Sequence, residues 1–216
     1  MGESQCTLFP LEFNRAVRVE ARAARLSAEA GALLIRELSD RLGLPELVAR
    51  HLDDPRDSER VVHPFIELLR TALFLLIQGW RDQDDVSLLR DDPVLRVAVS
   101  RRRGEAPLRS APAPDVPEAL CSQSTLSRLL YALGSAENRE GLAALVRELV
   151  APLLCGRDEI TLDLDSFPHP VHGHQPGTAY NGHYRTRCFH PIVASVEGRY
   201  FLGGQLREGN VHTAEG

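Results

Sequence analysis

Lysine is absent from this chain of 216 residues, and its only methionine is Met1. All 25 basic residues are therefore arginines, and together with 30 acidic residues they leave a formal charge of −5. This charge balance argues against indiscriminate nucleic-acid binding by the whole surface, although a local basic face remains compatible with it. Hydrophobic residues make up 43% of the chain, which is too many for a disordered protein and enough for a folded core.

Cysteine is also scarce, and the four that occur lie far apart: Cys6, Cys121, Cys155 and Cys188. No pair has the C-x-x-C spacing, so neither a zinc ribbon nor a disulfide framework is supported. The longest apolar run, residues 72–77, is far shorter than the roughly 20 residues that cross a bilayer. We therefore expect a reduced, cytoplasmic protein with no membrane segment.

Helical signals dominate the first 150 residues. Apolar side chains recur at helical spacing over residues 28–42 and 64–79, with Gly43 and Pro64 at the expected boundaries. Shorter or less regular patterns predict further helices over residues 45–52, 85–89, 92–99, 124–133 and 137–154.

Arginines recur at helical spacing near the start of the chain, which predicts that one helix face carries Arg15, Arg18, Arg22 and Arg25. Such a face either binds phosphates or, because glutamates are interleaved, is a solvated surface with ion pairs. Residues 101–117 hold four prolines and predict a linker. Its basic triplet, Arg101, Arg102 and Arg103, is a better candidate for contacts with phosphate, although short basic runs are often only solvated.

Residues 122–128 (SQSTLSR) resemble the turn and the first residues of a DNA recognition helix. Short polar side chains and one arginine at a helix N-terminus reach both phosphates and base edges, so Ser124, Thr125 and Arg128 are candidate DNA contacts. The alternative is an ordinary helix cap in which Ser122 or Ser124 bonds the first amides. The residues alone leave both interpretations open.

The pattern changes at Glu159, after which residues 160–165 alternate apolar and polar side chains as a strand does. Asp163 and Asp165 then share one face, and carboxylates at the end of a strand commonly hold Mg²⁺ for phosphoryl transfer. The alternative is a pair of solvent-facing aspartates on an edge strand. Residues 192–196 and 200–207 predict two further strands, and residues 167–190 predict a long loop with a small hairpin.

Five of the eight histidines lie between the first two of these strands: His169, His172, His174, His183 and His190. They suggest a rival function, a zinc hydrolase with ligands from this loop. The sequence lacks an H-E-x-x-H motif, so most of these histidines are better explained as loop residues or nucleic-acid contacts.

Several short motifs occur in a fixed order along the chain. They are residues 43–44 (GL), 54–57 (DPRD), 63–64 (HP), 79–85 (GWRDQDD), 89–93 (LRDDP), 122–128 (SQSTLSR), 162–165 (LDLD), 172–175 (HGHQ), 181–184 (NGHY) and 206–210 (LREGN). From about residue 30 to residue 216, this series resembles the DDE transposases of bacterial insertion sequences, in the branch called transposase DDE domain group 1.

The resemblance implies an α+β protein with two parts. Residues 1–155 are expected to form a helical DNA-binding region, and residues 156–216 the first strands of an RNase H-like catalytic domain. The family's first catalytic aspartate lies on the first strand of that fold and matches the Asp163/Asp165 pair. Asp165 is preferred as the ligand for Mg²⁺, because it ends the strand and is followed by the small Ser166, and Asp163 is the reserve candidate.

The sequence also departs from the family pattern. Ser166, Phe167 and Pro168 follow the aspartates, where the family has a small residue and then threonine or aspartate. The second aspartate and the glutamate of the catalytic triad are not found, so we expect an incomplete catalytic domain that cleaves no DNA by itself.

The expected partner is double-stranded DNA with the element's terminal inverted repeats, and self-association remains open. The alternative function is that of a regulatory fragment that inhibits the complete transposase.

Overall fold

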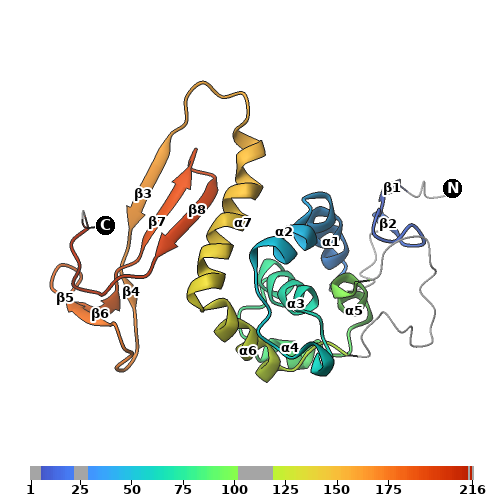
Figure 1. Ribbon diagram of the computed structural model, residues 1–216, viewed down its shortest axis with the longest axis horizontal. Helices are drawn as coiled ribbons and strands as arrows, with labels where there is room; N and C mark the ends of the chain where they lie inside the picture. Colours follow the sequence, from blue (N-terminus) through green and yellow to red (C-terminus); the bar gives the residue numbers. More distant parts are fainter. Residues whose placement is uncertain (1–5, 22–28, 102–118, 214, 216) are drawn as a thin grey trace. The chain divides into compact units, whose positions relative to one another are not determined.

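The computed structural model describes residues 6–21, 29–101, 119–213 and 215, and it has a mixed α+β fold (Figure 1). The chain divides into two compact units, residues 1–139 and residues 140–216. Helices make up most of the first unit, and antiparallel strands make up most of the second. Within the described parts of the chain, no helix is both long enough and apolar enough to cross a membrane.

An antiparallel hairpin of β1 (Cys6–Pro10) and β2 (Arg18–Ala21) begins the first unit. The prediction of a helix with an arginine face is therefore wrong in the described residues: Arg15 lies in the turn and Arg18 lies in β2, while Arg22 and Arg25 lie outside the described residues. The physical reason is a local turn at Asn14. Its Oδ1 accepts a hydrogen bond from the amide of Ala16 (3.0 Å) and its carbonyl accepts one from Val17 (3.1 Å), and these bonds compete with a helix.

The expected helices are confirmed as α1 (Gly31–Arg41), α2 (Leu44–His51), α3 (Phe65–Ile77), α4 (Asp85–Leu88), α5 (Pro93–Val99), α6 (Gln123–Leu133) and α7 (Ala136–Leu154), with a 3₁₀ turn η1 (Ser58–Arg60). Gly43 separates α1 from α2 with a φ of +67°, a conformation that costs glycine little. Asp92 begins α5, since its side chain accepts hydrogen bonds from the amides of Val94 and Leu95.

The core of the first unit lies where α1, α3, α5 and α6 meet. Buried members include Leu68 and Phe74 of α3, Leu95 of α5, and Leu126 and Leu129 of α6. These side chains come from the apolar stripes of their helices, so helical periodicity predicts them. The only tryptophan, Trp80, packs against this cluster, and its indole N–H donates to Glu29 (3.3 Å).

A buried ion network ties the helices of the first unit together. The Arg36 side chain is fully buried and donates to the carbonyls of Ala98 and Ser100 at the end of α5, and its Nε lies 2.9 Å from Asp40. Arg70 reaches the same carboxylate from α3 at 2.8 Å. The Arg36 guanidinium also stacks on the ring of Phe13, with 4.5 Å from Cζ to the ring centroid. Each buried cation therefore has partners, as burial of charge requires.

The second unit contains residues 140–154 of α7 and two small sheets. The first sheet joins β3 (Leu162–Ser166), β7 (Ile192–Val196) and β8 (Tyr200–Gln205) in the antiparallel order β3-β7-β8, which confirms the three strands that the sequence predicts. The β7–β8 turn is tight because Glu197 and Gly198 both have positive φ, at +58° and +59°, and the Arg199 amide donates to Val196.

The second sheet lies within residues 167–190, where a loop and hairpin were expected. It joins β4 (His169–Pro170), β5 (Ala179–Asn181) and β6 (Thr186–Phe189) in the order β4-β6-β5. The hairpin is confirmed as β5–β6, and β4 adds a third strand that its two-residue length made undetectable by alternation. Gly209 lies against this sheet: its carbonyl accepts from Asn181 (2.6 Å), and a Cβ there would collide with the carbonyl oxygens of Cys188 and Ala179.

Candidate functional site

The helix α6 carries three of the residues predicted to contact DNA. Ser122, which precedes it, has an extended backbone, and its Oγ lies 3.0 Å from the hydroxyl of Ser124 and 2.9 Å from that of Thr125. Ser122 makes no side-chain capping bond to an amide of this helix, in contrast to the expectation for an ordinary capping serine. Ser124 and Arg128 are exposed, and Thr125 is half-buried.

The buried side of α6 fixes which residues remain accessible. Leu126 and Leu129 are 3% exposed and belong to the core, which leaves Thr125 half-buried beside them and Arg128 exposed. Ser127 donates a hydrogen bond to the side chain of Gln83 (2.7 Å), which anchors the helix against the segment before α4. The orientation of the candidate DNA contacts is thus set by packing on one side and by this bond on another.

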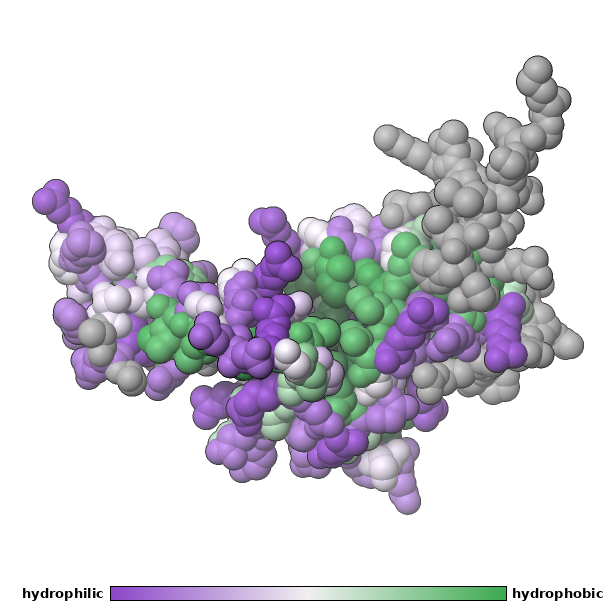
Figure 2. Space-filling view, turned by 90° about the horizontal axis from the view of Figure 1, so that it is seen from above, coloured by the Kyte–Doolittle hydropathy of each residue, from purple (hydrophilic) through white to green (hydrophobic). Residues whose placement is uncertain are grey.

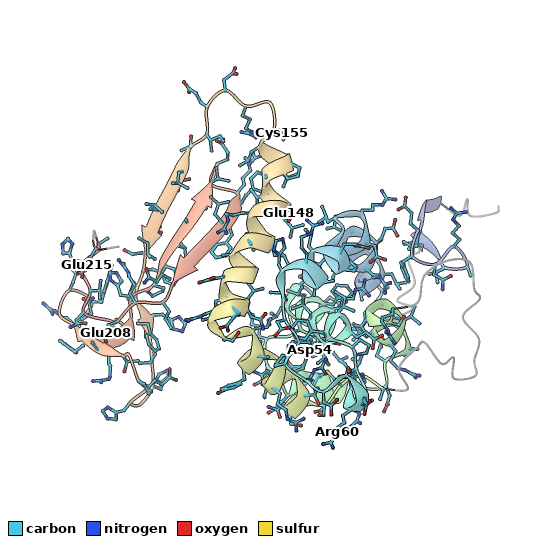
Figure 3. The ribbon with its side chains drawn as sticks, viewed as in Figure 1. Asp54, Arg60, Glu148, Cys155, Glu208 and Glu215 are labelled. Atoms are coloured by element: carbon cyan, nitrogen blue, oxygen red, sulfur yellow. The ribbon has the colours of Figure 1, made fainter. Side chains whose placement is uncertain are left out.

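Thr125 and Arg128 line a cavity of about 1130 Å³ that lies wholly within the first unit. One wall is α6, and the other is the segment of residues 53–63 that leads into α3. We call this cavity the α6 groove. In Figure 3, the labels Asp54 and Arg60 mark the 53–63 segment. The sequence identified residues 54–57 as a motif without a role, so the contribution of this segment to the site was missed.

Hydrogen bonds hold the 53–63 segment in place. Arg56 binds the Asp54 carboxylate in bidentate fashion, with both N–O distances at 2.7 Å, and donates to the carbonyl of His63 (2.9 Å). Asn138 accepts from the amide of Asp53 and donates to its carbonyl, which joins the segment to the start of α7. These bonds therefore fix this wall of the groove to its neighbours, which favours a preorganised binding site.

Two titratable side chains of the groove have shifted pKa values. The hydrogen bond from Arg56 lowers the pKa of Asp54, against an opposing effect of burial. Burial lowers the pKa of His63 below its ordinary value of 6.5, and the charges of Arg56 and Arg90 lower it further. Near neutral pH, His63 is therefore an uncharged imidazole that can both donate and accept a hydrogen bond.

Of the arginine triplet, only Arg101 falls within the described residues. Its amide donates to Glu67 (3.0 Å), and its guanidinium Nε lies 3.8 Å from the same carboxylate. Burial raises the pKa of Glu67, and these contacts with Arg101 oppose the rise. Arg101 thus has a structural partner, while Arg102 and Arg103 lie outside the described residues.

Asp163 and Asp165 lie on β3, which is an edge strand of its sheet, and both side chains are exposed. Their neighbours across the ladder are Ser195 and Val193, so the two carboxylates share one face as predicted. The Asp165 carboxylate accepts a hydrogen bond from the amide of Ser166 (2.8 Å). Among the described side chains, no three carboxylates, histidines or cysteines lie close enough together to hold a metal ion.

The five histidines suggested as zinc ligands all belong to the described part of the chain, and they also form no group of three that could hold a metal ion. His172 and His174 are exposed. His190 is 1% exposed, and its Nδ1 lies 2.9 Å from the carbonyl of Val211. The second unit therefore does not assemble these five histidines into a ligand cluster.

Comparison with known proteins identifies the family of this chain. A family model described as transposase DDE domain group 1 matches residues 9–216, which is nearly the whole chain. No curated protein and no solved structure matches it. The chain therefore belongs to the transposase DDE domain group 1 family.

Proposed function

We propose that this member of the transposase DDE domain group 1 family recognises the ends of a DNA insertion sequence through its first unit. The observation that carries the proposal is the exposed face of α6, where Thr125 and Arg128 lie on the wall of the α6 groove. Family membership supplies the reaction class, which is DNA transposition.

The chemistry of the α6 face suits contact with duplex DNA. An α-helix fits the major groove of B-DNA, and an arginine near its start can donate two hydrogen bonds to a guanine. Ser124 and Thr125 lie at the N-terminus, where hydroxyls and backbone amides bind phosphate oxygens. The guanidinium of Arg128 is exposed and makes no ion pair with the described residues, so it is available to DNA.

We further propose that β3-β7-β8 begins an RNase H-like catalytic domain, with Asp165 as the first catalytic carboxylate and Asp163 as its reserve. The two exposed carboxylates on one strand face supply the oxygen donors that Mg²⁺ takes in proteins, usually one or two per ion. When bound there, Mg²⁺ would stabilise negative charge on a phosphate and activate an attacking oxygen. The chain's own residues would position that ion by carboxylate contacts from β3.

Two carboxylates from one strand do not provide the pair of metal sites that in-line displacement of a phosphodiester uses. The acidic residues described elsewhere in the second unit, including Glu197 and Glu208, do not join Asp163 and Asp165 in a cluster. We therefore propose that this chain by itself binds DNA without cutting it. Activity would require further carboxylates brought to β3.

The test is binding of the purified chain to a duplex with the element's terminal repeats and to a scrambled duplex, over a range of salt concentrations. We expect preference for the repeats and affinity that falls steeply with salt. Arg128→Ala is expected to weaken specific binding by about 1–3 kcal/mol. The matched control is Arg147→Ala, since Arg147 is an exposed arginine on α7. Equal binding of both duplexes, unchanged by Arg128→Ala, would refute recognition by α6.

A further inference from the structure

Two hydrophobic residues of the α6 groove, close to the candidate DNA contacts along the chain or across the cavity, are unusually exposed. Tyr131, one turn beyond Arg128 on α6, is 88% exposed, and Val62 on the opposite wall is 85% exposed. Single exposed hydrophobic residues are common and need no explanation. Here two large side chains stand almost fully exposed on the facing walls of one cavity, which is the pattern of a binding site rather than of a random surface.

The interior of the groove is apolar, and its edges are polar. Phe65, Leu68 and Leu129 line it; Phe65 is half-buried, and the two leucines are buried. His63 and Thr125 add hydrogen-bonding groups at the edge. An apolar interior with a few polar groups suits a flat, aromatic ligand with hydrogen-bonding edges, such as a nucleobase.

The charges around the groove further restrict the kind of ligand that it can bind. The exposed guanidiniums of Arg128 and Arg60 lie at the rim, where they can contact phosphates, although Arg60 also lies 3.5 Å from Asp57. Acidic side chains, Asp53 and Glu137, also line the groove. A long DNA backbone laid along the whole groove would meet these carboxylates, whereas one or a few unpaired nucleotides held near Arg128 would avoid them.

We propose that the α6 groove holds an unpaired base of the bound DNA, stacked on Tyr131, with its phosphate beside Arg128. This inference rests on the proposed contact between α6 and duplex DNA and extends it to a single-stranded segment next to the duplex. A tyrosine stacks on any base, because every base has a π-face, and a stacked base contributes about 1–3 kcal/mol. Tyr131 thus acts as a stacking platform that reads no sequence.

The experiment uses the whole chain and two probes: a blunt duplex, and the same duplex with a short thymidine extension that contains one 2-aminopurine. We expect tighter binding of the extended probe, with quenching of the 2-aminopurine fluorescence as the base stacks. Tyr131→Ala should lower affinity for the extended probe by about tenfold, abolish the quenching, and leave binding of the blunt duplex within about twofold. Tyr131→Phe keeps the ring and should keep both properties.

The controls distinguish a failure of this inference from a failure of the proposed binding of duplex DNA by α6. Leu88→Ala removes another exposed side chain of the first unit, 78% exposed and outside the groove, and should change neither probe. Binding of the blunt duplex without any effect of Tyr131→Ala on the extended probe would overturn the inference alone. Failure of the chain to bind either probe would overturn both. Self-association that is lost in Tyr131→Ala, with DNA binding unchanged, would assign the groove to a second copy of the chain and also overturn the inference.

Discussion

The two units of this protein bury different kinds of interaction. The first unit buries whole charged side chains, among them Arg36 at 0%, Glu37 at 2% and Arg70 at 2% exposure, inside an apolar cluster formed by several helices. Figure 2 shows that this unit also carries hydrophobic side chains on its surface. The second unit leaves the apolar side chains of β3 largely exposed, with Leu162 at 56% and Leu164 at 64%.

The buried interactions of the second unit are mainly bonds to the backbone. Asn181 donates to the carbonyl of Gly209, Arg207 donates to that of His190, and Gly209 itself packs directly against carbonyl oxygens of the β4-β6-β5 sheet. The difference indicates that side-chain packing and charge pairing stabilise the first unit, whereas close backbone contacts stabilise the second. The substitutions that most reduce stability should therefore differ between the units. In the first unit they remove a buried charge, and in the second unit they add a methyl group where the backbone is closely packed.

The largest effect is expected for Arg36→Leu. The substitution leaves the carbonyls of Ala98 and Ser100 without their buried donor and removes one partner of Asp40, so we expect a loss of about 3–5 kcal/mol in the free energy of unfolding of the first unit. Denaturant titration followed by the fluorescence of Trp80 measures it, because the only tryptophan lies in this unit. Arg60→Leu, whose ion pair with Asp57 is exposed on both sides, should cost less than about 1 kcal/mol. Equal losses in the two variants would contradict the role of the buried network.

The next effect is expected in the second unit for Gly209→Ala. The added methyl group meets two carbonyl oxygens that belong to strands and cannot move independently, so we expect a loss of about 1–3 kcal/mol. Hydrogen exchange of the β5 and β6 amides reports this loss, and the transition of Trp80 should remain unchanged. Gly182→Ala is the matched control, since a Cβ at Gly182 meets nothing within 4 Å. A Trp80 transition that shifts with Gly209→Ala would show that the units do not unfold separately.

A smaller effect is expected from pH, and only in the first unit. Because burial lowers the pKa of His63 in the folded state, the unfolded chain binds the proton more readily, so stability is present above pH 6.5 and is lost as the pH falls below it. The Trp80 transition should therefore move to lower denaturant concentration between neutral pH and the range below 6.5. His63→Gln should flatten this dependence, and an unchanged slope in that variant would assign it to another group.

The smallest effect on stability is expected for the double substitution Asp163→Ala, Asp165→Ala. Both carboxylates are exposed on an edge strand, so we expect changes within about 0.5 kcal/mol in unfolding and no change in binding of the terminal repeats. Neither the original chain nor the variant should nick the repeat duplex with Mg²⁺ or Mn²⁺ present. Cleavage by the original chain that disappears in the variant would show that the second unit is already a complete catalytic site.

The sequence predicted the elements of this fold well where one local pattern acted alone. Apolar periodicity and the positions of Gly43 and Pro64 placed the helices from α1 to α7, and alternation placed β3, β7 and β8. The prediction was wrong where two local patterns competed. The helical spacing of the arginines predicted a helix, but the turn at Asn14 gives the hairpin β1–β2. Strand β4 has only two residues, too few for alternation to be recognised.

Some features of the candidate site likewise have local causes, and others depend on contacts between distant parts of the chain. Sequence alone predicted that a helix begins near Ser124 and that Thr125 and Arg128 lie close together on it, because helical geometry relates residues three apart. Only the tertiary structure decided that residues 53–63 form the facing wall, and that the Arg36–Asp40 pair, whose spacing is typical of a solvated helix face, lies in the core. The physical reason is that burial of a charge depends on partners such as the carbonyl of Ala98, 62 residues away, which no local pattern contains.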